Sequence, residues 1–196
     1  MPWFLLVSFV ASASLVQDRD PRLWTRLPAV VAGRVQTLAD SAARLRLPVE
    51  PLVQKALEGR SKGAPDERIV AAVAALLGAL ERSRTALGAT SAEPEVVAGA
   101  EWLRAGGSAS RLSGLRMAAP SRQLAVAIAT GTDLMTRGWP EAEAGQATDR
   151  LLAAKATDRD FLALRSRIEQ AVRLGGTPME AVLSEFRRLE TGNKSP

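Results

Sequence analysis

The sequence repeats one short junction that ends a helix, turns the chain and starts another helix. In each copy a glycine stands two residues before a proline, and an acidic residue follows the proline within two positions. The copies are Gly63-Ala64-Pro65-Asp66-Glu67, Gly138-Trp139-Pro140-Glu141 and Gly176-Thr177-Pro178-Met179-Glu180. Glycine adopts the left-handed conformation that ends a helix, and proline suits the first position of the next helix. The helix dipole favours an acid in the first turn. These corners predict helices that turn back on one another.

Two further signals mark helix starts. Thr177 and Glu180 have the spacing of a capping box, in which each side chain accepts a hydrogen bond from the other residue's backbone N–H. The segment Gly107-Ser108-Ala109 occupies an equivalent position with no proline, and here Ser108 is the expected cap. We therefore count a fourth corner at this segment.

Between the corners, apolar residues recur at helical spacing. One stripe runs through Val31, Val35, Leu38, Ala42 and Leu45, and a wider one through Ile69, Val70, Val73, Leu76, Leu77 and Leu80. Two more follow Phe161, Leu164, Ile168 and Val172, and then Met179, Val182, Leu183, Phe186 and Leu189. We expect an all-α fold with no sheet. Because the corners are unevenly spaced, it is either an irregular bundle or a short solenoid-like stack of αα-hairpins.

Composition shifts divide the chain into segments. We expect a helical domain over residues 28–190 and a frayed polar tail at 191–196. The connection from Leu87 to Glu95 contains Gly88, Thr90, Ser91 and Pro94, so it is a possible boundary between lobes 28–87 and 92–190. Residues 14–27 are expected to form an exposed leader.

The first residues have features of an export signal. Residues 1–16 carry no charged side chain, and an apolar run from Trp3 to Val10 precedes the small residues Ala11-Ser12-Ala13. This pattern predicts a signal peptide at 1–13, cleaved after Ala13, and a periplasmic or secreted protein. The run is shorter than the ~20 residues of a membrane-spanning helix, so we expect no stable span after processing. The basic residues that usually begin a signal are missing. The alternative is therefore a cytoplasmic protein in which this segment is a buried helix.

The side chains on which most catalysis depends are absent. The sequence contains no Cys and no His, which excludes thiolate and imidazole chemistry and most zinc, haem and copper sites. Acidic pairs such as Asp66-Glu67 and Glu141-Glu143 stand at predicted helix starts, where capping explains them. We predict no enzyme activity, no catalytic residue, no cofactor and no metal. The alternative is a carboxylate-dependent hydrolase acting on an envelope glycan, which needs two acids that face each other across a cleft.

Four residues are candidates for contact with a partner: Trp102, Trp139, Arg165 and Arg173. Trp139 occupies a corner position that Ala64 and Thr177 fill elsewhere, and tryptophan is enriched at binding hot spots. Packing against the following helix explains it equally well. The arginines near the C-terminus alternate with Glu residues, as on a solvated helix surface, so we expect no nucleic-acid binding.

Together these features predict a non-enzymatic, exported helical scaffold or binding module. Its partner is expected to be a protein or polymer of the cell envelope, held in a groove between hairpins. If the N-terminus is not a signal, the alternative is a cytoplasmic regulatory or nucleic-acid-binding protein.

Overall fold

The structure is a computed structural model that describes residues 19–177, 180, 183–184 and 187–188. The predicted signal peptide, the first part of the predicted leader and the predicted tail at 191–196 lie outside these residues. The described part contains helices and no strand, which confirms the all-α prediction. The helices are α1 (Pro21–Arg26), α2 (Ala29–Arg44), α3 (Glu50–Ser61), α4 (Asp66–Leu87), α5 (Glu93–Arg104), α6 (Ala109–Ala118), α7 (Ala125–Thr136), α8 (Glu141–Ala153) and α9 (Asp158–Arg173).

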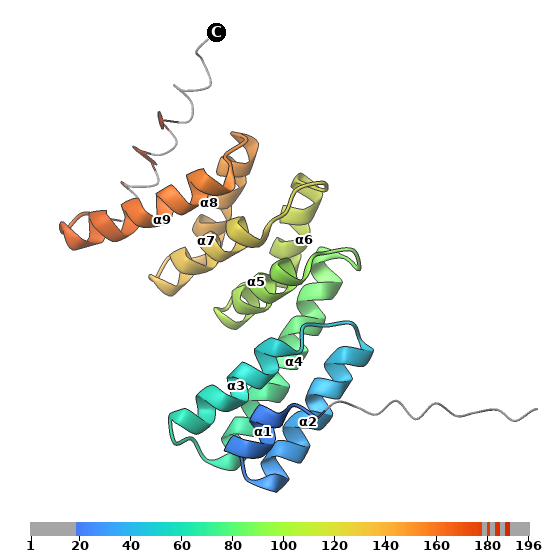
Figure 1. Cartoon of the computed structure of the whole chain (residues 1–196). Helices are drawn as coiled ribbons and strands as arrows, with labels where there is room; N and C mark the ends of the chain where they lie inside the picture. Colours follow the sequence, from blue (N-terminus) through green and yellow to red (C-terminus); the bar gives the residue numbers. More distant parts are fainter. Residues whose placement is uncertain (1–18, 178–179, 181–182, 185–186, 189–196) are drawn as a thin grey trace, which may run out of the picture.

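The helices form a stack of two rows (Figure 1). In one row α5, α7 and α9 each pack against the next, and in the other row α2, α4, α6 and α8 do so. The rows are joined by contacts of α4 with α3 and α5, and of α8 with α7. The N-terminal halves of α5, α7 and α9 lie together, so these three helices run in the same direction. The helices α6 and α8 return the chain between them, as expected for consecutive αα-hairpins.

The apolar core continues along the stack through three clusters. The first extends from Leu23 on α1 to Ala100 on α5. The second joins Leu87 of α4 with Trp102 of α5, with α6 and with the start of α7. The third joins α7, α8 and α9 around Phe161. The first two clusters both contain residues of α4 and of α5, so apolar packing continues across the connection between the possible lobes 28–87 and 92–190.

A single corner geometry ends six of the helices. At each corner one residue has a positive φ, and the N–H of the next residue donates to the carbonyl five positions earlier, at 2.8 to 3.1 Å. This is the Schellman arrangement, which satisfies carbonyls at the end of a helix. The residues with positive φ are Arg46, Gly63, Gly106, Gly138, Lys155 and Gly175.

The predicted corners are found with shifts of one residue. Gly63 and Gly138 have the expected left-handed conformation, but elsewhere Gly106 and Gly175 adopt it in place of Gly107 and Gly176. Pro65 and Pro140 lie at the N-cap, one position before the first helical residue. Ser108 caps α6 as predicted, since its hydroxyl accepts from the N–H of Arg111 at 3.3 Å.

The predicted capping box after α9 is also present. The Thr177 N–H donates to Oε2 of Glu180 at 2.9 Å, and the Glu180 N–H donates to Oγ1 of Thr177 at 3.4 Å. Pro178 and most of the fourth predicted stripe lie outside the described residues. Leu183, which belongs to that stripe, is partly exposed.

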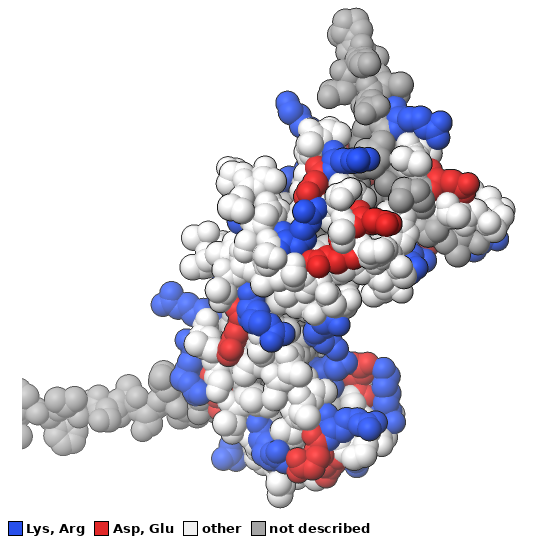
Figure 2. Space-filling view, turned by 180° about the vertical axis from the view of Figure 1, so that it is seen from behind, with Lys and Arg blue, Asp and Glu red and all other residues white. Residues whose placement is uncertain are grey.

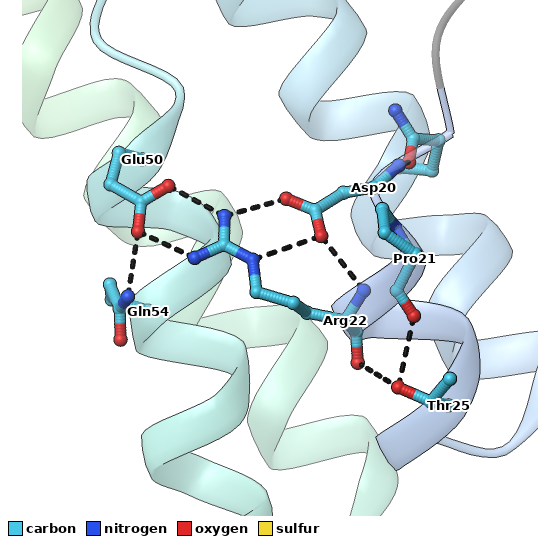
Figure 3. Close-up of polar contacts among 7 residues, drawn as sticks. Asp20, Pro21, Arg22, Thr25, Glu50 and Gln54 are labelled. Atoms are coloured by element: carbon cyan, nitrogen blue, oxygen red, sulfur yellow. Dashed lines mark hydrogen bonds and ion pairs between the residues drawn. The ribbon is translucent and has the colours of Figure 1, made fainter.

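The second half of the predicted leader is a structured part of the domain, which corrects the prediction for residues 20–27. The Asp20 side chain caps α1 by accepting from the Arg22 N–H, and Leu23 is fully buried. The Arg22 guanidinium lies between two carboxylates (Figure 3), with Nη2 at 2.7 Å from both Asp20 Oδ2 and Glu50 Oε2. An aspartate followed by proline is a helix-start signal, and Leu23 and Leu27 supply the buried face.

Candidate binding groove

An apolar groove of about 610 Å³ crosses the N-terminal halves of α5, α7 and α9. Seven of its nine lining residues are apolar, and the other two are Glu93 and Arg165. The apolar residues are Pro94, Val97, Ala98, Ala125, Val126, Ala129 and Leu162. This volume lies in the range of ligand sites, which are typically concave and mostly apolar.

The groove exists because the first half of α7 is apolar on all sides. Ala127 and Ile128 point into the core and are fully buried. On the other side of the same turns, Ala125, Val126 and Ala129 are only half-buried and line the groove. A helix that is apolar all round normally has both faces covered. Here one face remains open to solvent within the described part of the chain.

A buried carboxylate fixes the start of α7 relative to α5 and α6. Glu95 on α5 is buried, and its Oε1 accepts from the Leu124 N–H at 2.7 Å and from Arg116 of α6. Its Oε2 accepts from the Ala92 N–H at 2.9 Å. Burial raises the pKa of this carboxyl, but these hydrogen bonds and the nearby guanidinium outweigh burial, and the net pKa is lowered. Glu95 therefore stays ionised and holds three helices together beside the groove.

The two charged residues of the groove lie on opposite flanks. Glu93 is on α5 and Arg165 on α9, and α7 packs between these two helices. Arg165 donates from Nε to Oδ2 of Asp133 on α7 at 3.3 Å. Glu93 is exposed and has no ion pair with any described residue. A bound segment would therefore meet a carboxylate on one side and a guanidinium on the other.

The structure brings one of the four candidate partner-binding residues, Arg165, to the groove. The prediction is corrected at Trp102, which has no exposed surface and donates from Nε1 to the Ser108 carbonyl at 3.2 Å. Trp139 is half-buried at its corner and packs against the core of α7, α8 and α9. Arg173 is exposed in the last turn of α9 and donates to the Glu169 carbonyl. The four residues do not form one surface.

The sequence analysis missed the apolar lining of the groove. Its signal is the run Ala125-Val126-Ala127-Ile128-Ala129, in which apolar residues occupy every face of a helix. A single buried stripe leaves some positions polar, so this run indicates a second apolar surface. The stripes considered in the sequence did not include it.

A second groove, lined by α3, α4 and α5, contains two carboxylates and bears on the hydrolase alternative. It measures about 560 Å³ and includes Glu58 and Glu101. Hydrogen bonds from Lys55 and Lys62 lower the pKa of Glu58 to about 2, whereas a general acid in glycoside hydrolysis needs a raised pKa. Glu101 pairs with Arg104 on its own helix at 2.7 Å. The arrangement is that of surface ion pairs.

Charges of both signs are mixed over the surface. Figure 2 shows Lys and Arg side chains interspersed with Asp and Glu over the face opposite to that of Figure 1. Many of these charges are paired between helices, as in Arg34 with Glu67 and Arg111 with Asp149. None of the described helices has the length and hydropathy of a membrane span.

Comparisons with protein-family models, with curated proteins and with solved structures found no match to this chain.

Proposed function

We propose that this protein is an exported, non-enzymatic binding module that holds a partner in the groove formed by α5, α7 and α9. The observation that carries this proposal is an open apolar groove of about 610 Å³ on the row formed by α5, α7 and α9. A concave, mostly apolar surface with a few polar groups is the usual form of a binding site. Export is supported by the apolar run before Ala11-Ser12-Ala13 and places the partner in the cell envelope.

The binding proposal is tested by photo-crosslinking in the cells that make the protein. A photoreactive residue at Ala129 lies in the groove, and one at Ala75, an exposed position of α4, is the matched control. We expect a defined adduct from position 129 and none from position 75. Equal labelling from both positions, or none from either, overturns the proposal.

Export is tested separately by N-terminal sequencing of the protein recovered from the same cells. We expect the mature chain to begin at Ser14. A chain that retains Met1 would overturn export and favour the cytoplasmic alternative, while leaving the binding result to stand by itself.

A further inference from the structure

The chemistry of the groove restricts which kind of partner fits it. We infer that the occupant is an amphipathic α-helix of another protein, with basic residues along one flank of its apolar stripe and acidic residues along the other. This inference rests on the proposed function of the groove and adds the class of partner.

The groove offers few hydrogen-bonding groups to an occupant. Any segment that enters the groove brings backbone or hydroxyl groups, and a buried polar group without a partner costs free energy. The lining side chains are apolar except for Glu93 and Arg165 at the flanks. An extended peptide adds to a sheet edge, and the described residues contain no strand. A helix satisfies its own backbone groups, so it can enter an apolar groove without this cost.

The same argument disfavours a glycan polymer. A sugar carries hydroxyl groups around its ring, so its site must supply donors and acceptors together with polar side chains that fix its orientation. This groove has two charged residues and no aromatic side chain. Of the two partner classes expected from the sequence, the groove therefore favours a protein.

The shape of the groove also suits a helix. Three of the lining residues, Ala98, Ala125 and Ala129, are alanines from the two adjacent helices α5 and α7. Small side chains allow helices to approach to the short end of the usual interaxial distance, about 8 Å. Leu162 on α9 is 50% exposed and stands on the other side of α7 as an apolar contact. A helix lying over α7 would thus contact α5, α7 and α9 together.

The two flanks of the groove carry opposite charges. Glu93 on α5 and Arg165 on α9 flank α7, so a helix over α7 has a carboxylate on one side and a guanidinium on the other. A partner with basic residues on one flank and acidic residues on the other pairs with both. A partner with flanks of one sign pairs on one side and is repelled on the other.

The test uses synthetic peptides of about five helical turns, roughly 18 residues, as probes. The mixed peptide has a leucine stripe with lysines on one flank and glutamates on the other. Two more peptides carry the same stripe with only lysines or only glutamates, and a fourth has the mixed composition in scrambled order. Binding to the full chain is measured by fluorescence anisotropy. We expect the mixed peptide to bind most tightly, by about fivefold over the single-sign peptides, the size of one exposed ion pair.

Two variants with a charge placed in the groove, one variant with a reversed flank charge and one control test whether binding is specific to the groove. Ala129→Arg and Leu162→Glu each place a charge in the apolar groove and should weaken binding of the mixed peptide by about tenfold or more. Ala75→Arg, on exposed α4, should leave its binding unchanged. Glu93→Arg makes both flanks basic, so the glutamate peptide should become the tightest binder. Circular dichroism of each variant checks that the helices are intact.

Several results would overturn the inference. Equal binding of the scrambled peptide, no effect of either groove variant, or an unchanged preference in Glu93→Arg would each do so. Sedimentation that shows a dimer broken by Ala129→Arg would assign the groove to a second copy of this chain. A cross-link from position 129 to a glycan would support the proposed function and overturn the helical partner, whereas no cross-link at all would remove both.

Discussion

Glu95 and Arg116 join α5 to α6, and the same carboxylate oxygen that receives Arg116 also accepts the Leu124 N–H at 2.7 Å, where α7 begins. Arg116 donates in addition to the carbonyls of Ala119, Pro120 and Arg122, so it also fixes the connection between α6 and α7. The position of α7, which forms the centre of the groove, therefore depends on a polar link as well as on apolar packing.

Glu95→Ala is expected to lower the free energy of unfolding by about 3 kcal/mol. Removal of one partner of a buried ion pair leaves the other uncompensated, at a typical cost of 3–5 kcal/mol, and the partial exposure of Arg116 places this pair at the low end. Urea denaturation measures the change. The matched control is Glu93→Ala, two positions earlier and exposed, which loses only a helix-dipole contribution of less than about 1 kcal/mol. Equal losses in the two variants would contradict the role assigned to Glu95.

The same carboxylate makes stability depend on acid. Its pKa is lower in the folded protein than the ordinary Glu value of about 4.3. A lowered pKa adds stability that is fully present above the ordinary value and is lost as the pH falls through the folded value. Urea unfolding should therefore be measured from pH 7 to pH 3. The urea concentration at the midpoint is expected to decrease once the pH drops below about 4.5.

Other carboxyls, including Asp20, Glu50 and Asp160, also have lowered pKa values and act in the same direction. The contribution of Glu95 is isolated by comparison with Glu95→Gln, which should be less stable at pH 7 and should lose less on acidification. If stability depends on pH in the same way in the two proteins, the pKa of Glu95 does not differ between the folded and unfolded states.

Gly99 on α5 packs tightly against α4. A Cβ atom at this position would lie 2.2 Å from Oγ of Ser83 and 3.1 Å from Cδ1 of Leu87. Ser83 is itself buried and donates to the Val96 carbonyl at 2.8 Å. We expect Gly99→Ala to destabilise the protein by about 2 kcal/mol, as overpacking typically does. The measurement is again urea unfolding.

The contact with Ser83 predicts a non-additive double variant. Ser83→Ala removes the hydroxyl that the new methyl group would meet, so in that background Gly99→Ala should cost about 1 kcal/mol less. Gly78→Ala is the matched control on α4, because no atom lies within 4 Å of its added Cβ. It should be neutral or stabilising by up to about 1 kcal/mol, since alanine is the better helix former. If the effects of Ser83→Ala and Gly99→Ala are strictly additive, the backbones of α4 and α5 move apart to make room for the methyl group.

The fold was predictable from local signals, and the groove was not. The apolar stripe from Ile69 to Leu80 is buried as predicted, because burial of one helix face is encoded in spacing alone. Gly63 and Gly138 mark corners for a reason visible in the sequence, since glycine adopts a positive φ without steric cost. The prediction of a binding role for Trp102 was wrong because no local sequence signal distinguishes an exposed tryptophan from one that is buried in a core.

The groove depends on three helices that are distant in sequence, and their alignment is set by tertiary contacts such as that between Glu95 and Leu124. Each lining residue is ordinary in its own helix. The run from Ala125 to Ala129 is apolar on every face of α7, and the helices packed against α7 leave one of these faces open. Which face stays open is known only once the helices have been placed.

Two of the six described corners, those at Arg46 and Lys155, have no glycine at the position of positive φ. Lys155 has a φ of 57° and is exposed, yet it ends α8 with the same hydrogen bonds that Gly138 provides after α7. A left-handed conformation costs a non-glycine residue about 1–2 kcal/mol. Glycine avoids this cost but loses about 0.5–1 kcal/mol through the greater freedom of the unfolded chain. Lys155→Gly should therefore stabilise the protein by about 0.5–1 kcal/mol, which raises Tm by roughly 1–4 °C for a domain of this size.

Gly138→Ala is the reverse substitution at an equivalent corner and should lower Tm by a similar amount. The φ of 91° at this position is unfavourable for alanine, although no atom lies within 4 Å of the added methyl group. If Lys155→Gly lowers Tm, the corner after α8 does not hold the left-handed geometry, and the six corners are not equivalent.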